Sequence, residues 1–471
     1  MADTNTSFKP ALGLFDATMI VAGSMIGSGI FIVSADITRN VGSAGWLITV
    51  WLITGFMTLT AALSYGELSA MFPKAGGQYV YLKEAFNPLA GFLYGLSFFA
   101  VIQTATIAAV GVAFSKFLAY LVPGLGPEHI LANLGFITIN AGQLVSIALI
   151  VFLTYINTKG IEGGKLIQTT FTAVKLLSLF GLIVFGLTIA AKSEIWDANW
   201  ADAWGMKSRD AAGNIIGPVA GSAILGAIAA SMVGSIFSSD AWNNVTFIAG
   251  EVKNPKRNIG LSLMLGTLIV TIIYVAANIM YISVLPLESI ASAPQDRVAV
   301  SASNAIFGHV GTYVIAVMIM ISTFGCNNGL ILAGARVYHT MAKDGLFFKK
   351  TAELNKNNVP EFALWIQCIV ASLLCLSGKY GDLLDMISFV VVMFYALTIL
   401  GIFILRKNRP EVERPYKAFG YPLLPAIYIL MAIAFCILLI IYKPAFTWPG
   451  LIIVLAGIPI YYLAVANKNK A

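Results

Sequence analysis

The chain of 471 residues is 58% hydrophobic and only 11% charged, with a mean hydropathy of +0.84 and a net charge of +7. Soluble domains carry about 25% charged residues, so this composition excludes a soluble globular protein. The positive charge indicates membrane orientation rather than a nucleic-acid partner. Apolar segments long enough to cross a bilayer lie at roughly 13–38, 43–70, 88–121, 141–158, 166–191, 221–250, 260–283, 308–341, 360–378, 383–405, 422–441 and 447–465. We therefore expect an all-α integral membrane protein with twelve transmembrane helices.

Most of the 29 lysines and arginines fall at the two termini and in the connections after every second segment. Cytoplasmic loops of membrane proteins carry an excess of these residues. Both termini are therefore predicted to be cytoplasmic.

The first segment contains the run Gly23-Ser24-Met25-Ile26-Gly27-Ser28-Gly29. Three glycines within seven residues make a poor helix centre, because glycine has the largest backbone entropy cost. An interrupted helix is tolerated in a bilayer only where it is buried in protein or lines a cavity. The run therefore predicts a discontinuous helix, which is typical of transporters.

The sixth segment is interrupted in the same way, at Gly234–Asn244, and it opens with a similar Gly-Ser-Ile-Phe sequence. The two interrupted segments are five helices apart, and an odd number of helices inverts the second repeat relative to the first. We expect a single transporter domain, residues 1–471, with inverted five-helix repeats at 12–191 and 221–405. Two additional C-terminal helices follow at 422–465.

The two interruptions have opposite electrostatic character. The second half of the first segment starts near Gly29, so its free N–H groups and positive dipole end favour a carboxylate beside Gly27, Ser28 and Gly29. The first half of the sixth segment ends near Phe237, where free carbonyl groups favour an ammonium. A carboxylate at one break and an amine at the other describe an α-amino acid.

Five sequence motifs occur in order along the chain. They are Gly27–Phe31; Gly66–Leu68 with Pro73–Leu82; Gly250–Asn258; Phe324–Gly329 with Ala335 and Arg336; and Arg414–Lys417. With these motifs the chain resembles the amino acid–polyamine–organocation superfamily, and within it the L-type amino acid transporter branch. The resemblance covers essentially the whole chain and implies two inverted repeats, broken helices 1 and 6, and transport by alternating access.

The resemblance also implies which residues bind the substrate. At the first break, the residues expected to hold the carboxylate and part of the amine are Met25, Ile26, Gly27, Ser28 and Gly29. At the second break, the residues expected to surround the amine are Phe237, Ser238 and Asp240. Phe237 matches the gating aromatic of the family, with simple packing as the alternative.

Lys175 lies deep within the fifth segment, where a lysine costs about 2.5–3.5 kcal/mol to insert and is a functional candidate. The resemblance implies that its ammonium occupies the place that sodium fills in relatives. It would bridge the first break to the eighth segment, where Ser322 or Thr323 is the candidate partner. The alternative is a lysine that points along a water-filled path.

Asp240 has two interpretations. We expect it to be the N-cap of the second half of the sixth segment, starting at Ala241, because aspartate is a favoured N-cap. A buried carboxylate could instead bind and release a proton. Glu67 and Glu251 are either members of an inner gate with basic residues such as Arg336, or exposed helix ends.

No arrangement of residues predicts a metal ion, a cofactor or an enzyme active site. The four cysteines fall within apolar segments and are expected to be small buried residues: Cys326, Cys368, Cys375 and Cys436. The loop at 122–140, where mammalian relatives of this branch carry the cysteine that links a glycoprotein, has none. We therefore expect no disulfide-linked heavy chain.

The sequence predicts a sodium-independent exchanger of neutral L-amino acids. The polar run Ser238-Ser239-Asp240 favours small or polar substrates such as alanine, serine or threonine. Two alternatives stay open: a proton-coupled symporter, and an amino acid sensor or channel built on a transporter scaffold.

Overall fold

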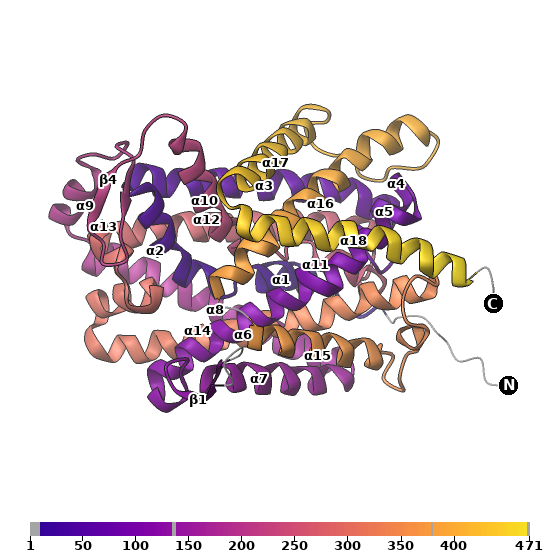
Figure 1. Cartoon of the computed structure of the whole chain (residues 1–471), viewed down its shortest axis with the longest axis horizontal. Helices are drawn as coiled ribbons and strands as arrows, with labels where there is room; N and C mark the ends of the chain where they lie inside the picture. Colours follow the sequence, from indigo (N-terminus) through magenta and orange to yellow (C-terminus); the bar gives the residue numbers. More distant parts are fainter. Residues whose placement is uncertain (1–9, 134–137, 378–379, 469–471) are drawn as a thin grey trace.

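The computed structural model describes residues 10–133, 138–377 and 380–468. Most helices run along the long axis of the molecule (Figure 1). The short helix α4 (Gln78–Ala85) lies at one end, and α9 (Ser193–Trp200) and β4 (Ile215–Pro218) lie at the other. We refer to these as the α4 end and the α9 end.

Each predicted segment coincides with an apolar helix or with an interrupted one. In chain order these are α1 (Leu14–Met25) with α2 (Gly29–Val41), α3 (Ala44–Met71), α5 (Pro88–Ser97) with α6 (Gln103–Leu121), α7 (Ala141–Thr158), α8 (Ile161–Phe185), α10 (Ala223–Ser238) with α11 (Asn244–Phe247), α12 (Pro255–Val284), α14 (Val298–Lys343), α15 (Glu361–Ser377), α16 (Tyr380–Asn408), α17 (Leu423–Tyr442) and α18 (Pro444–Lys468). Within the described residues, eight helices are long and apolar enough to cross a bilayer, and the bent pair α1 and α2 is a ninth candidate. The apolar stretches in α10, α15 and α18 are shorter, so twelve crossings stay a prediction.

The connections contain structure that the apolar pattern does not predict. Two antiparallel strand pairs are present: β1 (Ile130–Asn133) with β2 (Thr138–Asn140), and β3 (Lys207–Arg209) with β4. The described chain is therefore predominantly helical but not purely so. Both pairs are short and lie between helices, where they do not alter the helical bundle.

The third and eighth segments contain irregular helix. A π-helical turn, Phe98–Ile102, joins α5 to α6 in the middle of the third segment, and such turns are frequent at functional sites. Helix α14 begins ten residues before the predicted segment and bends at Gly308, whose φ of 68° suits a residue without a Cβ. The part of α14 that precedes Gly308 is therefore a separate helix at the α9 end.

Corresponding helices of the two predicted repeats pack on one another. Helix α2 packs on α10, α3 on α12, and α6 on α14. These are the first, second and third segments of each repeat. Such pairing is what two related repeats would produce, while their inverted relation stays a prediction.

Candidate functional site

The first break separates α1 from α2. Helix α1 ends at Met25 and α2 begins at Gly29, with a bend of 40° between their axes. The backbone leaves the helix at Ile26, whose ψ is 87°. Because α2 starts here, the N–H groups of Gly29 and Ile30 have no acceptor within the helix. The next N–H group, that of Phe31, donates to the carbonyl of the N-cap residue Ser28 at 3.1 Å.

The second break separates α10 from α11. Helix α10 ends at Ser238, one residue beyond the predicted end, and α11 begins at Asn244. Between them Ala241 has a φ of 62°, a left-handed conformation that is uncommon for a residue with a side chain. The chain therefore turns sharply before the helix restarts.

The two breaks touch each other. A Cβ placed on Gly29 would lie 1.9 Å from Ser238 Oγ and 2.9 Å from Ser238 Cα. One turn further toward the α9 end, a Cβ on Gly234 would lie 2.9 Å from Val33 Cβ. Glycine at both positions is what allows α2 and α10 to approach so closely.

Tyr274 of α12 joins the two breaks, and the sequence analysis did not identify it. Its hydroxyl lies 3.1 Å from the carbonyl oxygen of Met25 and 2.9 Å from that of Ser238, and it donates its hydrogen between them. The side chain is buried. A buried tyrosine hydroxyl needs a polar partner, and this requirement is a sequence signal for Tyr274. The same signal marks Tyr281 of this helix, whose hydroxyl donates to the Ile30 carbonyl at 3.3 Å.

Lys175 lies at the first break. It is fully buried, and its ammonium donates to the carbonyl oxygens of Gly23 at 2.5 Å and Ile26 at 2.7 Å. The Ser322 hydroxyl of α14 donates to the carbonyls of Ile26 at 3.2 Å and Gly27 at 3.3 Å. Lys175 and Ser322 therefore meet at the Ile26 carbonyl, which links α8, the break and α14.

The other residues of α14 near the break differ from expectation. Thr323 donates to the carbonyl groups of Ile319 and Met320 within its own helix, so the structure places Ser322 and not Thr323 at the break. Cys326 is buried as expected, but it is more than an apolar filler, because its thiol lies 3.1 Å from the Ser24 carbonyl. Four successive carbonyl groups from residue 24 to 27 thus have donors from other helices.

The interpretation of Asp240 as the N-cap of the second half-helix is wrong. Helix α11 starts three residues later than that interpretation requires, with Asn243 as its N-cap residue. The Asp240 carboxylate instead accepts a hydrogen bond of 2.5 Å from the Tyr395 hydroxyl of α16. Tyr395 in turn packs against Trp242 and Tyr65 at centroid distances of 5.1 and 6.0 Å. This aromatic cluster positions the carboxylate, and Tyr395 is a second residue that the sequence analysis missed.

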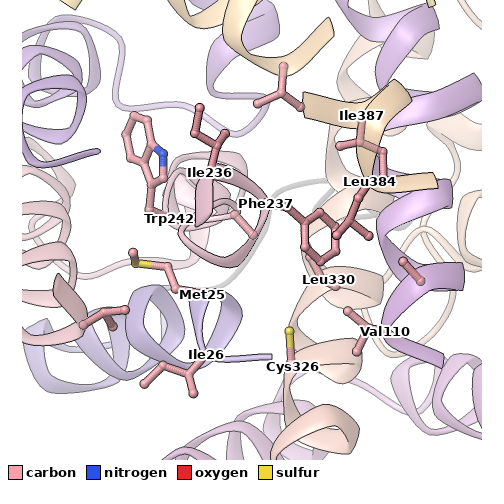
Figure 2. Packing of buried hydrophobic residues seen from close by; sticks show 14 of the residues in the cluster. Met25, Ile26, Val110, Ile236, Phe237, Trp242, Cys326, Leu330, Leu384 and Ile387 are labelled. Carbon is pink, nitrogen blue, oxygen red and sulfur yellow. The ribbon is translucent and has the colours of Figure 1, made fainter. Parts of the chain in front are cut away.

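Phe237 lies on the last turn of α10 and is buried. Figure 2 shows its ring pointing away from Trp242 and toward Leu330 and Leu384. The ring thus lies between the second break and the helices α14 and α16. This position fits both the gating aromatic and simple packing.

Ion pairs close the bundle on the α4 side of the breaks. Arg336 of α14 donates to Glu251 at 2.9 Å, and both side chains are buried. Glu67 of α3 accepts from Arg406 at 2.6 and 3.0 Å and lies 3.4 Å from Arg414. The alternative that Glu67 and Glu251 are exposed helix ends is therefore wrong.

Within residues 10–133, 138–377 and 380–468, no group of three or more histidine, cysteine, aspartate or glutamate side chains is arranged to hold a metal ion. The chemistry that the geometry offers is recognition of a small polar molecule. It combines helix N-terminal N–H groups, a buried ammonium and a buried carboxylate at two adjoining breaks.

Known proteins resemble this chain over nearly its whole length. A family model described as amino acid permease matches residues 12–465. The large neutral amino acids transporter small subunit 2 of Homo sapiens is 30% identical over 466 residues, which cover 98% of this chain and 82% of the relative. The b(0,+)-type amino acid transporter 1 of Mus musculus is 28% identical over 468 residues, 98% of this chain and 89% of the relative. The Asc-type amino acid transporter 1 of Mus musculus is 28% identical over 471 residues, 100% of this chain and 84% of the relative.

Proposed function

Because the chain belongs to the amino acid permease family, and within it to the L-type amino acid transporter branch, we propose that it exchanges neutral L-amino acids across the cell membrane without sodium. It is a multi-pass membrane transporter of amino acids and not an enzyme. Exchange mode, ion coupling and substrate preference form the proposal. Alternating access of the site at the two breaks is the proposed mechanism.

The observation that carries this proposal is the position of Lys175. Its ammonium donates to the Gly23 and Ile26 carbonyls, where a cation stabilises the negative ends of peptide dipoles that point into a dry site. A side-chain cation performs this role permanently, whereas a bound ion enters and leaves with the substrate. Transport with a fixed cation needs no ion gradient, which supports sodium independence.

The two breaks are proposed to bind the two charged ends of the substrate. At the first break, donors from other helices occupy the carbonyl groups of residues 24 to 27. The Phe31 N–H donates to the Ser28 carbonyl, so the N–H groups of Gly29 and Ile30 are the ones proposed to bind the carboxylate. At the second break, the carbonyl end of α10 and the Asp240 carboxylate attract an ammonium. Met25, Ile26, Gly27, Ser28 and Gly29 together with Phe237, Ser238 and Asp240 are the proposed substrate-binding residues.

Small or polar neutral side chains are the proposed preference. The breaks approach within contact distance at Gly29 and Ser238, which restricts the room for a large side chain. Asp240 and the Tyr395 hydroxyl give the second break polar atoms that suit a hydroxyl-bearing substrate.

The proposed orientation places the α4 end in the cytoplasm of the cell (inner) membrane, with both termini on that side. The buried pair Glu251–Arg336 and the cluster around Glu67 then form the closed inner gate, and Phe237 forms the outer one. No disulfide-linked heavy chain is proposed, because the loop at 122–140 lacks cysteine.

Proton-coupled uptake is the second candidate, and the Asp240–Tyr395 hydrogen bond favours it. A carboxylate buried beside the amine site could carry a proton when the substrate leaves. Under this candidate, Asp240→Asn abolishes the pH dependence of transport. Under exchange without proton coupling, Asp240→Asn alters affinity and leaves the pH dependence unchanged.

The deciding experiment uses the purified full chain in liposomes with radiolabelled L-alanine outside. We expect uptake that depends on unlabelled amino acid inside and that is unchanged when sodium is replaced by choline. Uptake driven by a pH gradient into empty liposomes would support the proton-coupled candidate. Absence of transport for all neutral amino acids, with binding retained, would favour a sensor.

A further inference from the structure

A cavity lies on the α9 side of the breaks, separate from the substrate site described above. Its volume is about 310 Å³, at the lower end of the range of about 300–1,000 Å³ that is usual for ligand sites. The charged residues that line it are Asp36, Arg39, Lys116, Asp296, Asp385 and Lys443. We call this cavity the vestibule.

The charges of the vestibule form two sets of ion pairs, which come from different parts of the chain. In one set, Arg39 of α2 lies 2.7 Å from Asp296 and 3.7 Å from Asp36. In the other set, Lys443, which follows α17, lies 3.1 Å from Asp385 of α16. Each set therefore presents both a cation and an anion to the cavity.

Fold stability does not account for this arrangement. Partly exposed ion pairs contribute only about 0–1 kcal/mol each, and the Arg39, Asp36, Asp296 and Lys443 side chains all keep between 20% and 52% of their surface exposed. In a chain with 11% charged residues, six charges around one cavity form a marked concentration. Such a cavity attracts charged solutes from solution.

The number and sign of the charges define the ligand. Three carboxylates face three cations, so a solute with a net charge is attracted by one half of the set and repelled by the other. A zwitterion gains from both halves, because its carboxylate and ammonium are offered partners of each sign. The other lining residues of the vestibule are apolar and include Val33 and Leu384, which suits the side chain of a neutral amino acid.

The vestibule lies one helical turn from the breaks. Val33 lies one turn beyond Gly29 on α2, and Val233 and Gly234 lie one turn before Phe237 on α10. A molecule in the vestibule therefore lies on the far side of Phe237 from the second break. In the proposed orientation this is the side open to the outside.

We propose that the vestibule is a second, outer binding site for zwitterionic amino acids, which captures the substrate before Phe237 admits it to the breaks. The inference rests on the proposed transport function. It adds a site that gives the outer and cytoplasmic faces of the carrier different apparent affinities for the substrate. Capture lowers the half-saturating concentration at the outer face only, because the vestibule lies on the α9 side of the breaks, away from the α4 end.

The test is the double variant Asp385→Asn with Lys443→Gln, which removes one ion pair without leaving an unpaired charge. We expect the KM for L-alanine at the outer face to rise about tenfold, the loss that one hydrogen bond to a charged group produces. The KM at the cytoplasmic face and the maximal rate stay unchanged, as measured in right-side-out and inside-out membrane vesicles. Radiolabelled alanine binding in detergent falls from two molecules per chain to one.

The matched control is Lys256→Gln with Glu413→Gln, which removes an exposed ion pair at 3.2 Å. It leaves both KM values and the binding ratio unchanged. A wild-type chain that binds one alanine, or a vestibule variant that loses maximal rate equally from both faces, overturns the second site and makes the ion pairs a simple gate. A wild-type chain that transports no amino acid overturns the proposed function, and this inference falls with it.

Discussion

Replacing Lys175 tests the role of a buried cation at the first break. Lys175→Met removes the ammonium and keeps most of the volume and length of the side chain, so it isolates the charge from the packing. The variant leaves the Gly23 carbonyl without its donor from α8 and leaves the Ile26 carbonyl with only the Ser322 hydroxyl, at 3.2 Å. Both groups are in a dry part of the bundle, where water cannot replace the lost partner.

The magnitude follows from these two hydrogen bonds. A hydrogen bond to a charged group contributes about 1.5–3 kcal/mol, so the two together stabilise the broken conformation by about 3–6 kcal/mol. Lys175 also carries a desolvation cost that disappears in the variant, which reduces the net loss toward the lower figure. If the conformation that binds substrate is destabilised by about 3 kcal/mol, the population of that conformation falls by about 100-fold. The exchange rate falls by the same factor.

The assay is alanine exchange in liposomes, with folding checked by gel filtration and thermal unfolding of the same preparation. Lys192→Met is the control, because Lys192 follows the same segment but is exposed. Lys175→Gln keeps a donor without the charge and is expected to retain intermediate activity. Exchange at the wild-type rate in folded Lys175→Met would refute the reasoning and favour a lysine without a coupling role.

Three further variants probe the contacts around the breaks. Gly29→Ala is expected to abolish exchange in a chain that still inserts, because its Cβ would lie 1.9 Å from Ser238 Oγ; normal exchange would show that the breaks separate in the working carrier. Tyr274→Phe removes one hydroxyl between two buried carbonyl groups, at a cost of about 1–3 kcal/mol, so exchange should slow about tenfold or more. An unchanged exchange rate would show that Tyr274 contributes only packing. Glu251→Gln removes the carboxylate that pairs with the buried Arg336 guanidinium, at a cost of about 3–5 kcal/mol. The unfolding temperature should therefore fall. An unchanged unfolding temperature would show that water reaches the pair.

The breaks could be predicted from sequence because their cause is local. Glycine content and polar residues within an apolar run interrupt a helix wherever it packs, and the observed ends at Met25 and Ser238 follow that pattern closely. Lys175 could also be identified as a functional candidate from the sequence, because an ionisable residue deep in an apolar segment is rare and costly.

The partners of these residues could not be predicted, because they depend on helix packing. The Tyr274 hydroxyl meets a carbonyl 249 residues away, and Tyr395 meets a carboxylate 155 residues away. The prediction that Asp240 is a helix N-cap was wrong for a related reason. Capping preference is local, but the left-handed turn at Ala241 delays the helix until Asn244 and frees the carboxylate to meet α16.

These contacts explain how two breaks can act as one site. Each break alone is an interrupted helix with unpaired backbone groups, which a bilayer would not tolerate. Lys175 and Ser322 supply donors to the first break, while Tyr274 donates between the carbonyls of Met25 and Ser238 and so belongs to both. A movement of α1 relative to α10 must lengthen the Tyr274 hydrogen bonds. A conformational change at either break therefore alters the hydrogen bonds at the other. Substrate bound across both breaks would reinforce the same link, and this is why the loaded carrier is expected to change conformation as a unit while the empty one does so slowly.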